Sequence, residues 1–402
     1  ISVRLSKAFK DFFQTEKAGS IVLIACTVVS LLIANSALGP GYLALWHGNI
    51  GPLSVEHWVN DGLMAVFFLL IGLELKRELY VGELSNIKNA SLPIIAALGG
   101  VAVPALIHFA FNYGTPTQAG IGIPMATDIA FAIGALALLG DRVPASLKVF
   151  LVALAVMDDL AAIIVIAVFY TADLSLTYLG VALGVLAVLV ILNRLRVMSL
   201  IPYLIGGAVA WYFMLESGVH ATIAGVLLAF TVPFTGIADD ENSPSSILER
   251  QLHWPVSFLI LPIFALANTG IIIGGGTAND LFSSNSLGIF LGLTLGKPVG
   301  ITLASFAAVA VGVSRLPLDL GWKHIFGAGI LGGIGFTMSI FITNLAFPGS
   351  SDVINASKMS ILIASLTAGM VGFVFLKLFG RPLTSDEDPD TMDFDNGNEA
   401  RA

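Results

Sequence analysis

Long apolar stretches recur along almost the whole of this 402-residue chain. A helix needs about 20 apolar residues to cross a bilayer, and twelve stretches come close to that length. They lie near residues 17–38, 59–79, 92–111, 121–139, 147–171, 177–195, 200–214, 219–235, 252–273, 287–312, 325–347 and 357–380. The pattern predicts an all-α polytopic membrane protein with twelve transmembrane helices.

Composition agrees with that fold class. The chain is 56% hydrophobic and only 11% charged, whereas a soluble domain carries about 25% charged residues. The single cysteine, Cys26, excludes an intramolecular disulfide framework and a thiolate metal cluster. The net charge of -8 is concentrated near the C-terminus, where seven acids and one arginine lie between Asp386 and Arg401. Nothing in the sequence indicates a nucleic-acid-binding surface.

The chain is expected to contain one transmembrane domain, residues 1–383, followed by an acidic disordered tail, residues 384–402. Apolar and basic residues interleaved over about 2–14 predict a short amphipathic helix on the membrane surface. Residues 21–33 resemble the core of a signal peptide, but the following residues show no change of character, so a transmembrane helix is favoured. Residues 45–58 contain a Gly/Pro turn and predict a small β-hairpin on the outer side.

Basic residues occur in alternate connections between the apolar stretches. They are Arg4, Lys7 and Lys10; Lys76, Arg77 and Lys88; Arg142 and Lys148; Arg194 and Arg196; Arg250; Arg315 and Lys323; Lys377 and Arg381. The connections after the first, third, fifth, seventh and ninth stretches contain no lysine or arginine, and Lys358 is the one exception to the alternation. Because basic residues stay on the cytoplasmic side, both termini are predicted to be cytoplasmic.

Four ionisable residues fall near the middle of apolar stretches. Asp128 belongs to the fourth stretch, Asp158 and Asp159 to the fifth, and Lys297 to the tenth. A charged side chain at this depth costs roughly 2.5–3.5 kcal/mol on insertion scales. These side chains must therefore face the protein interior or a water-filled cavity, and they are the first candidates for a functional site.

Such a cluster can exchange a proton for a cation. Ionised carboxylates offer hard oxygen ligands to a hard cation, and the same groups release it when they are protonated. Successive residues on a helix point about 100° apart, so Asp159 is predicted to face the cation while Asp158 pairs with Lys297. Purely structural roles stay open, since Asp128 can cap a broken helix, Lys297 can serve as a paired scaffold, and Thr127 can bond its own helix backbone.

An internal repeat is suggested by two similar segments. Thr127–Phe131 reads T-D-I-A-F and Thr337–Phe341 reads T-M-S-I-F, and each follows residues that loosen a helix, including Pro124 and Gly335. The predicted topology gives the two stretches opposite directions, as an inverted repeat requires. Spans broken at these points would expose helix ends at the depth of the acids, where Asp128 offsets a helix N-terminus and Lys297 offsets C-terminal ends.

A second group of charged residues lies toward the ends of the stretches. It contains Glu74, Arg77, Glu78, Glu249 and His253, and a pH-dependent gate is the functional interpretation, because histidine titrates near neutrality. Interfacial salt bridges are the structural alternative.

Two further residues lie near the outer ends of stretches. His220 is a candidate pH-sensitive group, and Asp61 is interpreted first as a helix cap, with an accessory role at the site as the alternative.

The sequence resembles the bacterial NhaA-type sodium/proton antiporters from about residue 9 to residue 381. The segments that carry the resemblance are Phe68–Glu78, Pro124–Phe131, Met157–Asp159, Gly218–Thr222, Leu261–Asn268, Gly296–Pro298 and Gly332–Ser339. The resemblance implies inverted repeats with two broken, crossing helices in spans 4 and 11. It also implies a bacterial inner-membrane location, electrogenic exchange of Na+ or Li+ for H+, and dimer contacts through the 45–58 hairpin.

The resemblance also assigns roles to residues. It implies that Asp158 and Asp159 bind the cation, with Asp128 and Thr127 beside them, and that Lys297 pairs with Asp158. It associates Glu74, Arg77, Glu78, Glu249 and His253 with pH activation. No cofactor is expected beyond the transported ions, and the protein is expected to be a transporter rather than an enzyme.

Two rival functions have weaker support. A sodium-coupled symporter of an organic anion would need a further substrate pocket. An intramembrane aspartyl protease would need two carboxyls that converge on one water with no lysine between them, and its G-x-G-D motif is absent from the sequence.

Overall fold

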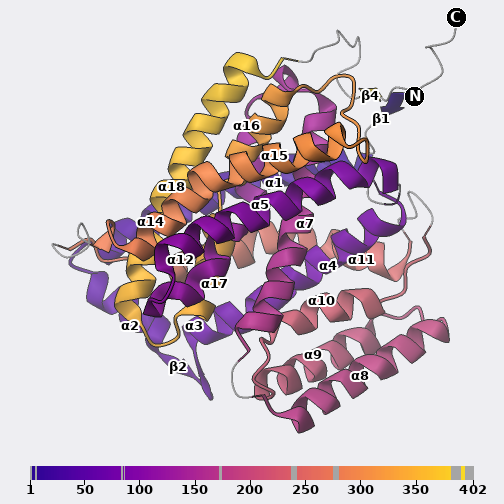
Figure 1. Ribbon diagram of the computed structural model, residues 1–402. Coiled ribbons are helices and arrows are strands. Elements are labelled where there is room, and N and C mark those ends of the chain that lie inside the picture. Colours follow the sequence, from indigo (N-terminus) through magenta and orange to yellow (C-terminus); the bar gives the residue numbers. More distant parts are fainter. Residues whose placement is uncertain are drawn as a thin grey trace, which may run out of the picture. The chain divides into compact units, whose positions relative to one another are not determined.

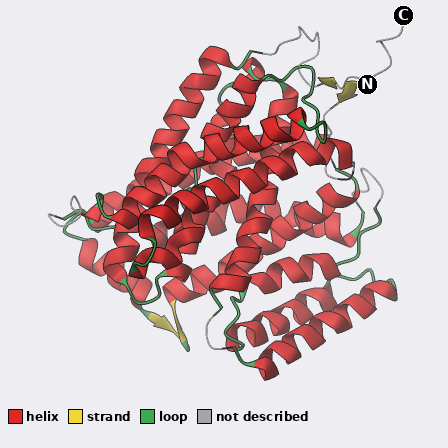
Figure 2. Ribbon diagram, viewed as in Figure 1, coloured by secondary structure: helices red, strands yellow, loops and turns green. Residues whose placement is uncertain are grey.

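The computed structural model describes residues 2–4, 7–82, 85, 87–171, 174–236, 242–274, 280–381 and 391–393. Helices make up almost all of this part of the chain (Figures 1 and 2). Within the described residues, nine helices are long and apolar enough to cross a membrane, or ten if one bent pair is a single span. Two shorter apolar helices, α9 (Ile201–Glu216) and α10 (Thr222–Thr231), lie where two more spans were expected. The chain is thus a multi-pass helical membrane protein.

The chain divides into two compact units. Unit 1 comprises Ile1–Ile21, Asn86–Ala161 and Gly274–Ala402, and unit 2 comprises Val22–Ser85 and Ala162–Ile273. The division falls within two helices, α1 (Lys7–Ala34) and α7 (Ala145–Phe169).

Unit 1 contains all four ionisable residues that the sequence placed near the middle of apolar stretches. Its further elements are α5 (Ile87–Asn112), the 3-10 helix η3 (Pro116–Met125), α6 (Ile129–Ala137), the 3-10 turn η4 (Gly140–Arg142), α14 (Ser284–Leu291), the π-helical turn η6 (Gly292–Gly296), α15 (Lys297–Ala310), α16 (Trp322–Gly332), α17 (Phe336–Ala346) and α18 (Ser351–Phe379).

Helices α5 and α15 lie side by side in unit 1 and approach each other through glycine (Figure 1). A Cβ on Gly99 would lie 2.3 Å from the carbonyl oxygen of Gly300, and a Cβ on Gly300 would lie 2.2 Å from that of Gly99. Small residues permit such contact between transmembrane helices. This packing brings Lys297, the first residue of α15, into the interior of the unit, where it is fully buried.

Unit 2 contains the remaining elements. They are α2 (Gly39–His47), β2 (Asn49–Ile50), β3 (Leu53–Ser54), α3 (Val55–His57), the π-helical turn η1 (Trp58–Leu63), α4 (Met64–Tyr80), α8 (Leu176–Arg194), α9, α10, α11 (Pro244–Pro255), the π-helical turn η5 (Val256–Ile260) and α12 (Leu261–Asn268). Helices α8, α9 and α10 pack together (Figure 1). A Cβ on Gly225 would lie 2.2 Å from the carbonyl oxygen of Ala65, so glycine also permits the close contact of α10 with α4.

Among the described residues there are also two small antiparallel sheets (Figure 2). Strands β2 and β3 pair Asn49 with Ser54 and Ile50 with Leu53 around Gly51, whose φ of 67° favours glycine. This is the hairpin that the sequence predicts within 45–58.

The second sheet joins β1 (Ser2–Arg4) to β4 (Thr391–Asp393). Residues 384–390 and 394–402 of the predicted acidic tail lie outside the described residues. The predicted surface helix at about 2–14 covers β1, residues 5 and 6, which lie outside the described residues, and the start of α1.

Candidate functional site

Two interruptions in helical structure build the center of unit 1. Thr127 and Asp128 lie in an extended segment between η3 and α6, and Gly333–Gly335 separates α16 from α17, whose axes differ by 48°. The interruptions bond to each other: the amide of Asp128 donates to the carbonyl of Ile334 at 2.6 Å, and the Thr127 hydroxyl donates to that of Gly332 at 2.8 Å. The free carbonyls at and just after the C-terminal end of α16 therefore accept hydrogen bonds from Thr127 and Asp128.

The Asp128 carboxylate caps two helices. One oxygen, Oδ1, accepts from the amide of Phe131 at 3.0 Å, which caps the N-terminus of α6. The other, Oδ2, accepts from the amide of Thr337 at 3.0 Å and from its hydroxyl at 2.5 Å, at the start of α17. A carboxylate is favoured there, because helix N-termini carry partial positive charge. Asp128 thus has the capping role that the sequence left open, and for two helices at once.

Asp158, on α7, accepts hydrogen bonds from two other residues of the center. Its Oδ2 accepts from the Lys297 ammonium and, at 2.7 Å, from the Thr127 hydroxyl. Lys297 and Asp158 are both 0% exposed, so the pair is sealed from solvent. A hydroxyl has one proton, so Thr127 donates to either Asp158 or Gly332 at any moment. Thr127 therefore connects the carbonyl of Gly332 to the ion pair, and its hydroxyl bonds to these groups rather than to its own helix.

Asp159 follows Asp158 on α7 and is also fully buried. The helix repeat directs the two side chains about 100° apart. Asp128, Asp158 and Asp159 together supply three carboxylates, against the single ammonium of Lys297, and all four residues are at most 2% exposed. Ionised together, they leave a net of two negative charges in a sealed site. Such an excess is costly unless protons or cations compensate it.

Some features of this center were not expected from the sequence. The turn η6 is π-helical and ends just before Lys297, and the following Pro298 lacks the amide that an α-helix would use there. Ser339 donates to the carbonyl of Ile123 at 2.7 Å, and Ser365 accepts from the amide of Phe336 at 3.1 Å. Ser339 belongs to the motif around Thr337, whereas no local signal identifies Ser365.

Gly335 is needed for close packing at the start of α17. A Cβ there would lie 2.2 Å from Ser339 Oγ and 3.0 Å from Leu293 Cδ2.

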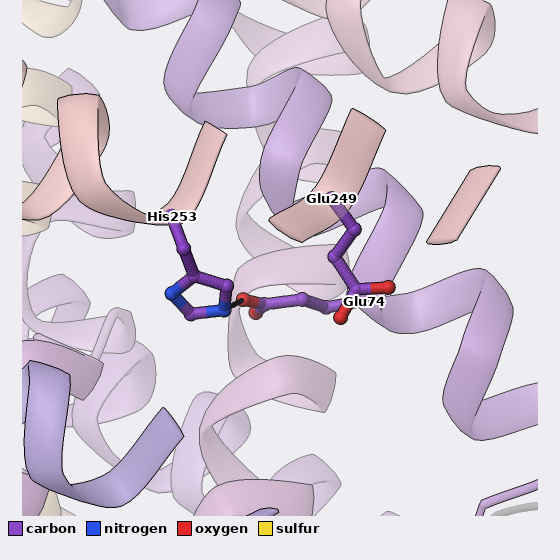
Figure 3. Close-up of side chains that lie close together, drawn as sticks. All are labelled: Glu74, Glu249 and His253. Carbon is purple, nitrogen blue, oxygen red and sulfur yellow. Dashed lines mark ion pairs between the residues drawn. The ribbon is translucent and has the colours of Figure 1, made fainter. Parts of the chain in front are cut away.

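Unit 2 contains the second predicted cluster, at the facing surfaces of α4 and α11 (Figure 3). The distances are 3.0 Å from His253 Nε2 to Glu74 Oε1, 3.1 Å from Arg77 Nη1 to Glu249 Oε1, and 3.4 Å from Arg77 Nη2 to Glu78 Oε1. All five residues that the sequence grouped here are brought together.

Lys76, next to this cluster, points elsewhere. Its ammonium donates to the carbonyls of Ala229, at 3.3 Å, and Val232, at the C-terminal end of α10. Cations are favoured at helix C-termini.

The remaining candidates also lie in unit 2. His220, between α9 and α10, contacts the carbonyl of Tyr170 through Nε2 at 2.8 Å. Burial lowers the pKa of this imidazole, while the bond to Tyr170 and the charge of Asp61 oppose the shift. Asp61 lies inside the turn η1, where its carbonyl accepts from Trp211 Nε1 at 2.8 Å. It is not the capping residue of that turn, so its interpretation as a helix cap is wrong.

Comparison with known proteins identifies the family of the chain. The family described as Na+/H+ antiporter 1 matches residues 10–376. The chain belongs to this family. It is 67% identical over 377 residues to a Na(+)/H(+) antiporter NhaA of Dechloromonas aromatica, a match that covers 94% of this chain and 97% of that protein.

More distant members of the Na+/H+ antiporter 1 family match over a similar length. The protein of the same name from Flavobacterium psychrophilum is 57% identical over 93% of this chain and 97% of its own length. Na(+)/H(+) antiporter NhaA 2 of Pseudomonas syringae pv. syringae is 50% identical over 92% and 95%. Membership in the family places the chain among secondary transporters rather than enzymes. The ion pair of Asp158 with Lys297 also disfavours the protease alternative, which needs two carboxyls without such a lysine.

Proposed function

We propose that the protein exchanges Na+ or Li+ for H+ across the bacterial inner membrane by alternating access, and so contributes to sodium and pH homeostasis. The observation that carries the proposal is the sealed excess of carboxylates around one ammonium in unit 1. Either protons or a hard cation can compensate this excess, and competition between them couples their movements. The names of the relatives, Na(+)/H(+) antiporter, support the same pair of ions.

Each residue of the center has a role in the proposed exchange. Asp159 is the main cation ligand, and Asp158 alternates between Lys297 and the ion. Thr127 and Asp128 lie beside the ion, and Thr337 and Gly335 hold the partner break in place. The contact of Thr127 with both Asp158 and Gly332 supports this, because movement of either break changes the surroundings of the ion pair.

We also propose electrogenic exchange, with more protons than sodium ions moved per cycle. The center contains several groups that can bind a proton, yet these groups surround a single cation site. No cofactor takes part, and Na+ or Li+ and H+ are the cargo. Glu74, Arg77, Glu78, Glu249, His253 and His220 are proposed to make the exchange pH-dependent, with Asp61 as an accessory group near His220.

The membrane arrangement is a further part of the proposal. We propose twelve crossings, inverted repeats with broken helices at Thr127 and Gly333–Gly335, and both termini in the cytoplasm. The reciprocal contact of Gly99 and Gly300 supports such a repeat, since each glycine meets the other's carbonyl in the same way. A homodimer through the 45–58 hairpin is proposed because Leu45 and Ile50 expose large apolar side chains there.

Asp159→Asn provides the direct test of the proposed function. Inverted vesicles that contain the protein are energised, and collapse of the pH gradient is followed after addition of NaCl, LiCl or KCl. The parent protein is expected to respond to Na+ and Li+, and Asp159→Asn is expected to lose the response, because the amide carries neither the negative charge nor the titrating proton. Asp352→Asn, a substitution in the first turn of α18, is the matched control. Full activity of Asp159→Asn would refute the assignment.

A further inference from the structure

We propose that Glu74, Glu249 and His253 form a binding site for a divalent transition-metal ion of the Zn2+ type. Each of the three offers one ligand atom, and these atoms all lie within 4.8 Å of one another. Figure 3 shows the His253 imidazole against the Glu74 carboxylate, with the Glu249 carboxylate farther from the imidazole along the Glu74 side chain. The inference concerns binding alone and does not depend on the proposed exchange.

The helices present these ligands in a suitable arrangement. Glu249 and His253 are four residues apart on α11, so they share one face of that helix. Glu74 comes from α4, and its Oε1 is 3.0 Å from His253 Nε2. Tetrahedral ligands at Zn–ligand distances of about 2.0–2.2 Å lie about 3.4 Å apart. Small side-chain rotations would therefore bring the third ligand into place.

The ligand types select the metal. One imidazole with two carboxylates is a ligand set that catalytic zinc sites use, with one position left to water. Ca2+ takes six to eight oxygen ligands, and Mg2+ retains most of its water, so neither fits a set that includes a nitrogen. Imidazole suits Zn2+, Co2+ and Ni2+ instead.

The charge balance also favours a dication. Glu74, Glu78 and Glu249 supply three carboxylates against one guanidinium, that of Arg77, which leaves a net of two negative charges when all three carboxyls are ionised and His253 is neutral. Lys76 does not offset this charge locally, because its ammonium bonds to carbonyls of α10. One divalent ion would neutralise the excess.

Arg77 is the competing cation, and the structure provides an alternative partner for it. Arg77 contacts Glu249 through Nη1 and Glu78 through Nη2. When a metal takes the Glu249 carboxylate, Arg77 can keep its contact with Glu78. Bound metal would then link α4 directly to α11 and raise the thermal stability of the protein, since a ligand that binds the folded state stabilises it.

The test uses full-length, tag-free protein in detergent, with Co2+ as a spectroscopic probe and Zn2+ in calorimetric titration. We expect one ion per chain with micromolar affinity, visible Co2+ bands that Zn2+ abolishes, and a higher melting temperature with Zn2+. His253→Gln should weaken binding at least about tenfold. His47→Gln is the matched control, because His47 is an exposed histidine 3.7 Å from Glu56 and should leave binding unchanged.

A second variant distinguishes loss of a metal ligand from loss of the fold. His253→Cys retains a ligand atom of a different kind, so its Co2+ complex should gain a thiolate-to-metal charge-transfer band. Absence of binding by the parent protein would overturn the proposal. Equal affinity in the parent and His253→Gln, or no thiolate band in a folded His253→Cys variant that binds Co2+, would also overturn it, because the ion would then bind elsewhere.

Discussion

The two charged clusters of this protein have the same balance of charge but different construction. Each combines three carboxylates with one ammonium or guanidinium: Asp128, Asp158 and Asp159 with Lys297 in unit 1, and Glu74, Glu78 and Glu249 with Arg77 in unit 2, where His253 is a further member. Lys297 and Asp158 are 0% exposed, whereas Arg77 is 26% and Glu249 8% exposed. The first cluster is sealed and the second is open to solvent at its edge.

The two clusters are also held in place by different kinds of backbone structure. The unit 1 cluster depends on interrupted backbone, since Thr127 and Asp128 bond to the carbonyls of Gly332 and Ile334. The unit 2 cluster consists of side chains on the continuous helices α4 and α11. A sealed cluster can exchange its ion only if the backbone around it moves, whereas ions and protons can reach the open cluster directly. This difference is consistent with the proposed roles, ion exchange for the first cluster and a pH response for the second.

The largest expected effect comes from removing the basic residue of each cluster. Lys297→Ala leaves a buried carboxylate without its partner, which costs about 3–5 kcal/mol. Arg77→Ala removes a partly exposed group and should cost about 1–2 kcal/mol. Thermal unfolding of the two purified variants in detergent, compared with the parent, shows which substitution lowers the melting temperature more. Equal destabilisation would contradict the distinction between a sealed and an open cluster.

The role of the broken backbone predicts a smaller effect at Gly333. A Cβ there would lie 2.3 Å from the carbonyl oxygen of Leu293, and backbone cannot move aside as a flexible side chain can. Gly333→Ala should therefore destabilise the protein by about 1–3 kcal/mol.

Gly180→Ala is the control for this substitution. Gly180 lies on the continuous helix α8, and no side chain or backbone beyond its own helical turn lies within 4 Å of the added Cβ, so alanine should stabilise the helix by about 0.5–1 kcal/mol. The melting temperatures of the two variants should shift in opposite directions. A neutral or stabilising Gly333→Ala would show that the break tolerates a side chain.

The smallest expected effect is the pH dependence at His220, whose pKa is lowered below its ordinary value of 6.5. The unfolded chain then binds a proton more readily than the folded protein, so this residue lowers stability as the pH falls through 6.5, and the loss levels off below the folded-state pKa. His220→Gln should reduce the fall in melting temperature on acidification. His47→Gln is the exposed control. An unchanged pH profile in His220→Gln would exclude this contribution.

The sequence predicted much of the fold and of the site because lipid makes polar residues conspicuous. Apolar length identified the transmembrane helices, and Asp128, Asp158, Asp159 and Lys297 stood out as costly groups in apolar stretches. Glycine and proline before Thr127 and Thr337 indicated where helical structure is interrupted. The capping of two helices by Asp128 was only partly predictable. The cap on α6 is local, through the amide of Phe131, whereas the cap on α17 involves Thr337 from a distant part of the chain.

Features that arise from packing between distant segments were not predictable. The π-helical turn before Lys297 is not encoded by any local periodicity, although Pro298 disfavours the regular bonding there. The bond of Lys76 to the end of α10 requires knowledge of which helix lies beside α4. Helix α10 is shorter than the apolar stretch 219–235 that predicted it, whereas α9 matches the stretch 200–214 closely.

Calorimetric titration of the purified protein with Na+ at several pH values measures whether protons and Na+ compete for one site. If protons and Na+ compete for the carboxylates around Asp158 and Asp159, the apparent Na+ affinity should weaken steadily as the pH falls and reach a plateau at high pH. A Na+ affinity that does not change with pH would contradict the account.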